Sequence, residues 1–365
     1  MNTQKKPLKI AIVAYDLQPG GLSKVIVEVF KMLQSEYTVK LLLFNNTEIL
    51  HESIPNVKVQ IKDSLISRFN KYLRLKQILK ENKFDFILDF RYRINPLTEF
   101  FWTKFIYSGN QVIYTIHSSK LETYLPKSTF LTQFFYGDSF KIVCVSKGIE
   151  QSAREKFDLK NLVTIYNSIS IENKTETETE FNFIENQYIL AIGRFEKVKQ
   201  FDKLIVAYSK SKLPSKNIKL VIVGNGTQFE ACQNLVRELH LDESVQLTGY
   251  LENTKELYQN ALLTVLCSKH EGFPMVILES LAAGVPVVSF DLETGPSEII
   301  LDKNNGLLVE NQNFDKLIEA IETLVSNEEL YNFCQSNTTI SVEKFKTENI
   351  KNDWFVLLNS LINDK

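Results

Sequence analysis

The chain opens with a strand, a glycine-rich turn and a helix, and this order constrains the fold more than any other feature. Residues 8–15 (LKIAIVAY) form an apolar run that predicts a buried strand. Gly20 and Gly21 follow, and residues 25–33 then place apolar side chains at helical spacing. Such a unit begins a doubly wound parallel sheet. Further strands are predicted within 37–44, 84–90, 111–116, 142–148, 162–169, 188–192, 218–226, 244–251, 262–268 and 285–290.

The length of the chain divides these strands between two domains. The 365 residues, 44% apolar and 24% charged, are typical of a globular protein with two cores. A polar stretch at 172–185 with alternating Thr and Glu predicts an exposed linker. We therefore expect an α/β protein with domains at 1–170 and 171–345, followed by a last helix at about 346–365.

Composition argues against several classes of protein. The 42 basic and 44 acidic side chains give a net charge of −2, so we expect no nucleic-acid partner. The polar N-terminus does not resemble a signal peptide, and no stretch reaches the roughly 20 apolar residues of a membrane span. Four distant cysteines with no C-x-x-C pair favour buried thiols in a reducing cytoplasm, without a structural metal. They are Cys144, Cys232, Cys267 and Cys334.

Candidate ligand contacts follow three strands of the first half. Gly20 and Gly21 allow close approach of the backbone, and the helix after them favours an anion, although a plain tight turn is the alternative. Arg91 and Arg93 follow a strand and either clamp a phosphate or carboxylate or form salt bridges with neighbouring acids. His117 stands at a strand tip, where a ligand contact and a structural role are both open.

A basic stretch suggests a membrane contact. Residues 62–83 contain seven basic and two acidic side chains, with apolar residues near helical spacing. One interpretation is a core helix with a solvated basic face. The other is a patch that attracts anionic lipid headgroups, which the aromatic stretches at 100–105 and 130–136 also favour.

The second half contains a candidate pyrophosphate site. Gly193 and Arg194 end a strand, and Lys199 opens the next helix. Two cations in this arrangement can neutralise a diphosphate leaving group, although ordinary surface cations are the alternative. A Gly-x-Gly pair, Gly224 and Gly226, ends the following strand and is a weaker sign of the same kind.

Two carboxylates, Glu271 and Glu279, stand eight positions apart. Between them lies a Gly-Phe-Pro turn at 272–274, and Pro274 suits the first turn of a helix. The free N–H groups of that turn would favour an anion, so both carboxylates could line one ligand with a phosphate and several hydroxyls. The alternative is a pair of solvated surface carboxylates.

The segment 270–288 resembles the Glu-x7-Glu segment of retaining glycosyltransferases of family 4. The Pro-Gly-Gly-Leu turn at 19–22, the strand that ends at His117 and the Gly-Arg-Phe-Glu-Lys-Val-Lys run at 193–199 resemble segments of the same family. This family has the GT-B fold, in which two Rossmann-like doubly wound domains face each other across a cleft. Gln200 stands where the family usually has glycine, which leaves the shape of that loop open.

The resemblance implies roles for individual residues. The second domain would hold a nucleotide-diphospho-sugar, with Glu279 on the ribose and Glu271 on the sugar. The first domain would hold the acceptor, and the last helix would pack back on it. The implied catalytic residues are Glu271, His117, Arg194 and Lys199. The implied donor contacts are Gly21, Gly193, Arg194, Lys199, Gly224, Tyr250, Glu271, Gly272, Phe273, Pro274 and Glu279. The implied acceptor contacts are Gly20, Arg91, Arg93 and His117.

The implied reaction is hexosyl transfer with retention, in which the leaving phosphate takes the acceptor proton. UDP is the commonest nucleotide in the family, and the absence of Asp-x-Asp favours a metal-independent reaction without a cofactor. We expect a glycan or lipid-linked acceptor in cell-surface polysaccharide synthesis, and a cytoplasmic enzyme peripheral to the inner face of the cell membrane. A UDP-sugar 2-epimerase and a non-catalytic nucleotide-sugar-binding protein remain as alternatives.

Overall fold

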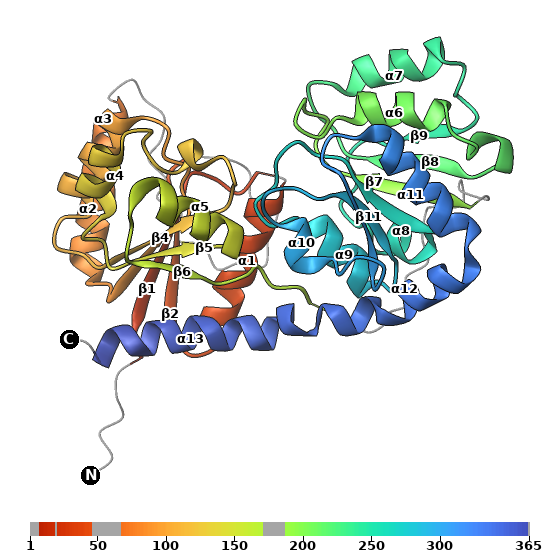
Figure 1. Ribbon diagram of the computed structural model, residues 1–365. Helices are drawn as coiled ribbons and strands as arrows, with labels where there is room; N and C mark the ends of the chain where they lie inside the picture. The colour runs from red at the N-terminus through yellow and green to blue at the C-terminus, as the bar shows by residue number, and fades with distance from the viewer. Residues whose placement is uncertain (1–6, 19, 46–66, 171–186, 364–365) are drawn as a thin grey trace. The chain divides into compact units, whose positions relative to one another are not determined.

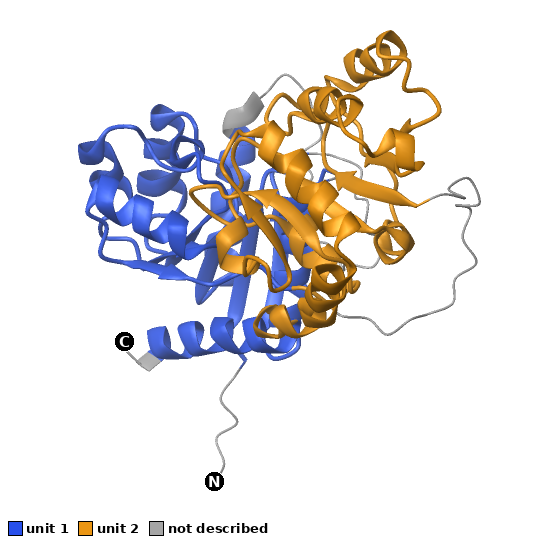
Figure 2. Ribbon diagram, turned by 45° about the vertical axis from the view of Figure 1, so that its right-hand side comes forward, with its two compact units in different colours: residues 1–168, 347–365 blue, residues 169–346 orange. Residues whose placement is uncertain are grey.

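The computed structural model describes residues 7–18, 20–45, 67–170 and 187–363 (Figure 1). The expected linker at 172–185, Pro19 and the start of the basic stretch at 62–66 lie outside these residues. The chain divides into two compact units, coloured separately in Figure 2. Unit 1 comprises residues 1–168 and 347–365, and unit 2 comprises residues 169–346.

Unit 1 is built on a six-stranded parallel sheet with strand order β2-β1-β3-β4-β5-β6. Most strand residues are buried, as expected where helices cover both faces of a parallel sheet. The strands are β1 (Lys9–Ala14), β2 (Thr38–Leu43), β3 (Phe86–Asp89), β4 (Val112–Ile116), β5 (Lys141–Cys144) and β6 (Leu162–Thr164).

Three helices of unit 1, which are α3, α4 and α5, begin at side-chain capping residues. The Asn95 side chain accepts hydrogen bonds from the N–H groups of Leu97 and Thr98, and Pro96 occupies the first helical position. The last helix of the chain returns to this unit, where Phe355 packs on Tyr37. The helices are α1 (Gly21–Gln34), α2 (Ser67–Asn82), α3 (Pro96–Phe101), the π-helical η1 (Trp102–Ile106), the 3₁₀ turn η2 (Leu121–Thr123), α4 (Thr129–Tyr136), α5 (Lys147–Phe157) and α13 (Thr347–Asn363).

Unit 2 has a second parallel sheet with strand order β12-β11-β10-β7-β8-β9. Alternate residues of its first strand enter different apolar clusters, Ile189 and Ala191 in one and Tyr188 and Leu190 in the other, so both faces are covered. The strands are β7 (Tyr188–Ile192), β8 (Lys219–Val223), β9 (Val245–Leu247), β10 (Leu263–Leu266), β11 (Val287–Phe290) and β12 (Gly306–Val309).

Helices and turns complete unit 2. They are α6 (Phe201–Ser209), η3 (Pro214–Lys216), α7 (Phe229–Glu238), α8 (Lys255–Asn260), α9 (Met275–Ala282), α10 (Pro296–Ile299), α11 (Phe314–Ser326), α12 (Glu328–Ser341) and η4 (Glu343–Phe345). All four cysteines of the chain are buried free thiols. Within the described residues, no helix has the length and apolar character needed to cross a membrane.

Each sheet has one point at which the strand order reverses. In unit 2 this switch point lies between β7 and β10, and in unit 1 it lies between β1 and β3. Ligands of open α/β sheets bind outside the carboxyl ends of the strands at such a point. The topology therefore directs attention to the loops at 193–200 and 267–274 in unit 2, and at 15–20 and 90–95 in unit 1.

Candidate functional site

The two loops at the switch point of unit 2 are tied together by hydrogen bonds. The Lys269 N–H donates to the Val198 carbonyl at 2.8 Å, and the Gln200 side-chain amide donates to the Cys267 carbonyl at 2.8 Å. The loop after β7 therefore has a fixed position relative to the loop after β10.

This arrangement brings two of the predicted site residues into contact. The Lys199 Nζ lies 2.6 Å from the Glu271 Oε1, with side-chain exposures of 19% and 14%. Both ends of the pair reach solvent, so a ligand can approach either group. The cation suits a phosphate and the carboxylate suits sugar hydroxyls.

Glycine is required where the loop after β8 crosses the end of β7. A Cβ at Gly224 would lie 1.9 Å from the Gly193 carbonyl oxygen, and the φ of Gly224 is +139°. A Cβ at Gly193 would lie 3.2 Å from the Lys199 Cε. Gly224 therefore permits the close approach of the two loops, and Gly193 leaves room for the stem of Lys199.

Gln200 adopts the backbone conformation that a glycine would favour at this position. Its φ of +54° and ψ of +36° lie in the left-handed region. The side chain is 1% exposed and makes the bond to Cys267 described above. The substitution therefore keeps the loop shape, at a cost in backbone strain that this hydrogen bond offsets.

Glu279 lies within α9 and has a partner that the sequence analysis did not identify. The Tyr258 hydroxyl, on α8, donates to the Glu279 Oε2 at 2.8 Å. Tyr258 is 2% exposed, and burial together with Glu279 raises its pKa well above the usual value, so the phenol stays protonated. Tyr258 thus orients one of the two site carboxylates. No spacing in the sequence links the two residues.

All three residues of the Gly-Phe-Pro turn at 272–274 are buried. Phe273 is buried against Phe345, with ring centroids 5.2 Å apart, so its side chain belongs to the core of unit 2. Pro274 is the residue before α9 and has an extended conformation, where we expected it within the first helical turn. The Thr294 hydroxyl donates to the Glu271 carbonyl at 2.6 Å and holds the start of the turn.

Arg194 and Tyr250 are exposed beside these loops. Arg194 forms no ion pair with any residue that the structure describes. Tyr250 is 53% exposed and follows Gly249, which lies next to the Gly224 backbone through a 2.8 Å hydrogen bond. Both side chains are therefore accessible to a ligand.

In unit 1, Gly20 and Gly21 lie at the start of α1, beside the switch point of that sheet. A Cβ at Gly21 would meet nothing within 4 Å, and one at Gly20 would lie 4.0 Å from the Gln18 carbonyl oxygen. Neither Cβ would therefore clash with the described residues.

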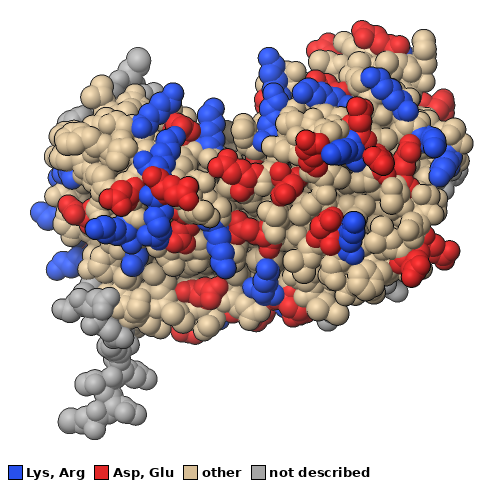
Figure 3. All heavy atoms as spheres, in the orientation of Figure 1, with Lys and Arg blue, Asp and Glu red and all other residues tan. Residues whose placement is uncertain are grey.

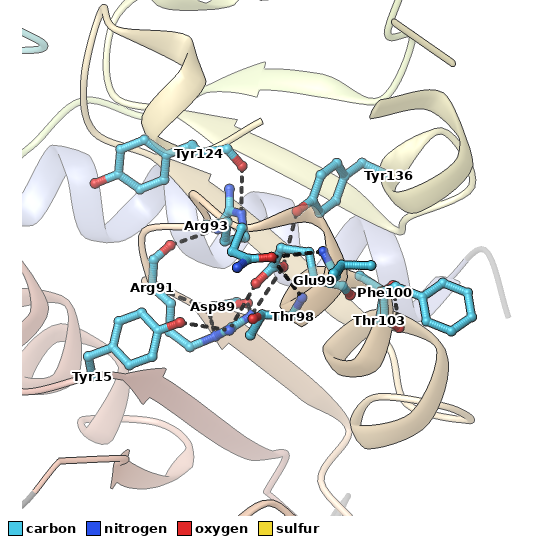
Figure 4. A network of polar contacts seen from close by, with 12 residues as sticks. Tyr15, Asp89, Arg91, Arg93, Thr98, Glu99, Phe100, Thr103, Tyr124 and Tyr136 are labelled. Atoms are coloured by element: carbon cyan, nitrogen blue, oxygen red, sulfur yellow. Dashed lines mark hydrogen bonds and ion pairs between the residues drawn. The ribbon is translucent and has the colours of Figure 1, made fainter. Parts of the chain in front are cut away.

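The structure corrects the expectation that Arg91 clamps an anion (Figure 4). Its side chain is fully buried, 2.7 Å from Asp89 and 3.2 Å from Glu99. Burial alone would lower the pKa of the Arg91 guanidinium, but the two carboxylates raise it well above the usual value. The Arg91 guanidinium therefore pairs with acids inside unit 1. This is the alternative in which the arginine forms salt bridges with neighbouring acids.

Arg93 is also unavailable to an acceptor. It is 1% exposed and donates to the carbonyl oxygens of Tyr124, Arg91 and Thr115 at 2.9, 3.1 and 3.0 Å. These bonds join the loop after β3 to β4 and to η2. Both arginines therefore hold the loops of unit 1 in place.

His117 follows β4 and is neutral. Neither ring nitrogen has a hydrogen-bond partner among the described residues, and the ring stacks on Phe90 with centroids 5.2 Å apart. Burial, with a smaller contribution from Arg93, lowers its pKa to about 3. The ring lines a small cavity together with Asn167 and Ser168.

Two family models match consecutive parts of the chain. The model described as Glycosyltransferase Family 4 matches residues 19–173, and the model described as Glycosyl transferases group 1 matches residues 173–340. Together they span most of both units.

Individual relatives extend this likeness. A relative from Campylobacter jejuni is 26% identical over 94% of this chain and 98% of its own length. Its name is N-acetylgalactosamine-N,N'-diacetylbacillosaminyl-diphospho-undecaprenol 4-alpha-N-acetylgalactosaminyltransferase. A poly(ribitol-phosphate) alpha-N-acetylglucosaminyltransferase from Staphylococcus aureus is 30% identical over 56% of this chain and 41% of its own length.

A solved structure shows the fold. Anabaena HepE in complex with UDP-glucose matches with a TM-score of 0.79 and 17% identity, over 97% of this chain and 100% of that protein. The expected fold class, GT-B with two parallel-sheet α/β domains, is confirmed.

Proposed function

Since the chain belongs to glycosyltransferase family 4 and is an enzyme of the hexosyltransferase type, we propose that it transfers a sugar with retention from a UDP-sugar to a glycan or lipid-linked acceptor. The observation that carries the proposal is the contact of Lys199 with Glu271 at the switch point of unit 2. Glu279, oriented by Tyr258, adds a second carboxylate from α9.

The donor would be held by groups of opposite charge. Arg194 and Lys199 would bind the diphosphate, and Glu279 would accept hydrogen bonds from the ribose hydroxyls. Glu271 would accept hydrogen bonds from the transferred sugar. Hydrogen bonds to charged groups contribute about 1.5–3 kcal/mol each, so the loss of either glutamate would weaken donor binding measurably.

The proposed reaction takes place on one face of the sugar. The bond from the anomeric carbon to the phosphate oxygen breaks, and a bond to the acceptor oxygen forms on the same side. The acceptor proton passes to the departing phosphate. Arg194 and Lys199 would stabilise the charge that develops on the diphosphate, so we propose a metal-independent reaction without a cofactor. Gly20 and the neutral His117 would meet the acceptor, and Gly21 would contact the donor.

The nucleotide and the acceptor are proposed by analogy with relatives. The name of the Campylobacter enzyme gives a diphospho-undecaprenol-linked acceptor, and HepE was solved with UDP-glucose. We propose UDP as the nucleotide, a role in cell-surface glycan synthesis, and a place of action at the inner face of the cell membrane.

A transfer assay tests this function. The protein is incubated with UDP-sugars and diphospho-undecaprenol-linked glycans, with and without EDTA, and the anomeric configuration of the product is read by NMR. We expect transfer with retention that EDTA does not abolish. Lys199→Ala should lower kcat by about 100-fold, because it removes a transition-state charge stabiliser. Glu243→Gln, at an exposed position, is the control. Release of a free 2-epimer without transfer would contradict the proposal.

A further inference from the structure

Large apolar side chains are exposed together on one part of unit 1. They lie on α3, the loop before it and α4, and three of them are more than 60% exposed. We call this surface the aromatic ridge: Ile94 (68%), Leu97 (82%), Phe100 (52%), Phe130 (75%) and Phe134 (46%).

The aromatic ridge is a continuous surface. Phe100 on α3 and Phe134 on α4 are nearly parallel, with centroids 6.4 Å apart, and Phe130 lies 6.5 Å from Phe134. The inward side of these segments is already filled, since Trp102 and Tyr136 are fully buried. The exposed rings are therefore surplus to the core, and an exposed patch of this kind marks an interaction site.

Exposed lysines lie within the segments of the aromatic ridge, and one exposed acid, Asp138, follows α4. In residues 94–107 and 127–137 the exposed charged side chains are Lys104 and Lys127, and the acid within these ranges, Glu99, is buried against Arg91. The Lys104 Nζ lies 4.3 Å from the centre of the Phe134 ring. Figure 3 shows a largely uncharged surface over α3 and α4 with both blue and red side chains at its border.

The neighbouring helix α2 supplies further cations. It buries Leu75, Ile78 and Leu79 in the core, and its exposed side carries Arg74 and Lys80 together with one acid, Glu81. The Lys76 Nζ lies 3.6 Å from the centre of the Phe105 ring of η1, which places α2 beside the aromatic segment. The basic stretch predicted from sequence is thus a core helix with a solvated basic face over the part that the structure describes.

We propose that the aromatic ridge inserts into the interfacial region of an anionic lipid bilayer, with Lys104, Lys127 and the basic face of α2 against the headgroups. Aromatic side chains favour the boundary between headgroups and acyl chains, and each lysine near an anionic surface strengthens attachment about fivefold. This inference deepens the proposed function, on which its biological meaning rests, because it names the surface that brings the enzyme to a lipid-linked acceptor.

Vesicle flotation without donor or acceptor tests the proposal. The full chain is mixed with vesicles of phosphatidylcholine alone or of phosphatidylcholine with phosphatidylglycerol. We expect flotation with the anionic vesicles, and at least about tenfold weaker partition for the double variant Leu97→Ser/Phe130→Ser, which removes two exposed apolar side chains. The matched control is Phe333→Ser/Ile340→Ser on α12, where the side chains are 52% and 70% exposed.

A charge variant adds a second arm. Lys104→Gln and Lys127→Gln should each weaken partition on anionic vesicles about fivefold and leave partition on neutral vesicles unchanged. The proposal is overturned if the wild type does not float, if the α12 variant loses as much partition as the ridge variant, or if the ridge variant only dissociates a dimer of this chain. Nucleotide affinity is measured in parallel on the ridge variant and should stay at the wild-type value. Loss of membrane binding is thereby distinguished from a failure of the transferase assignment.

Discussion

Tyr258 holds one of the two carboxylates of the candidate donor site through a single buried hydrogen bond. Tyr258→Phe removes the bond to Glu279 and leaves the ring in place. We expect nucleotide affinity to fall about tenfold, because Glu279 loses the hydrogen bond that orients it. Titration calorimetry with the nucleotide measures this change.

A second buried tyrosine serves as the control. The Tyr208 hydroxyl donates to the Ile218 carbonyl at 2.8 Å, in the core of unit 2. Tyr208→Phe should lower the free energy of unfolding by about 1 kcal/mol and leave nucleotide affinity unchanged. Equal losses of affinity in the two variants would mean that Tyr258 acts only through stability.

Gln200 allows a test of the strained loop. Gln200→Gly and Gln200→Ala both lose the hydrogen bond to Cys267, but only glycine relieves the left-handed backbone. We expect the glycine variant to be more stable than the alanine variant by about 1 kcal/mol, measured by urea unfolding. An alanine variant as stable as the glycine variant would show that backbone strain is not the deciding term.

His117 gives the stability a dependence on pH. Its pKa is about 3 in the folded protein and about 6.5 in the unfolded chain, so the unfolded chain binds the proton more readily. The contribution is fully present above pH 6.5 and is lost as the pH falls from 6.5 toward 3. Between pH 7 and pH 4.5 the loss should be about 2–3 kcal/mol.

The variant His117→Leu removes this titration. Its free energy of unfolding should decrease less than that of the wild type over the same range of pH. His270→Gln, at an exposed position, should follow the wild type. Identical pH profiles for wild type and His117→Leu would be inconsistent with a buried neutral imidazole.

Single residues were predictable from sequence where a linear motif carries the chemistry. Lys199 and Glu271 stand in such motifs, and the structure brings them into contact. Arg91 and Tyr258 were not, because their partners come from separate elements: Glu99 follows Arg91 by a full loop, and Glu279 lies 21 positions after Tyr258. A sequence shows that an arginine ends a strand but does not show which acids reach it.

At the scale of elements, the buried network around Arg91 fastens the loop after β3 to α3 and to α4. Arg91 contacts Asp89 and Glu99, and the Tyr136 hydroxyl donates to Glu99 at 3.1 Å (Figure 4). Arg91→Leu leaves two buried carboxylates without their cation. We expect the free energy of unfolding of unit 1 to fall by about 3–5 kcal/mol, measured by urea unfolding.

An exposed arginine provides the comparison. Arg154 pairs with Glu150 one turn earlier on α5, with side-chain exposures of 45% and 24%. Arg154→Leu should change the free energy of unfolding by about 0.5 kcal/mol or less. A loss of that small size for Arg91→Leu as well would show that the buried network is not structurally important.

Most elements were predictable because buried parallel strands are short apolar runs with clear ends. β12 (Gly306–Val309) was missed. It is four residues long and begins with glycine, a residue typical of turns. A Cβ at Gly306 would lie 2.2 Å from the Val287 carbonyl oxygen, so the close pairing with β11 requires glycine there. The exposure of the aromatic ridge was also hidden, since core and surface aromatics look alike in a sequence.

At the scale of the whole molecule, the sequence predicted two domains of α/β type and a last helix with the first of them. The two sheets and the return of α13 to unit 1 agree with that division, with boundaries after residues 168 and 346. Each unit has its own core and its own switch point. The nucleotide is therefore expected to bind mainly through residues of unit 2, and to stabilise that unit by mass action.

Thermal unfolding with UDP, GDP and ADP tests this central claim most directly. A ligand at 100 times its Kd stabilises the folded state by about 2.7 kcal/mol. We predict stabilisation of the wild type and of Glu243→Ala by UDP, and its loss in Glu279→Ala. If no nucleotide stabilises the wild type, or if Glu279→Ala responds as the wild type does, the donor site is not at the switch point of unit 2.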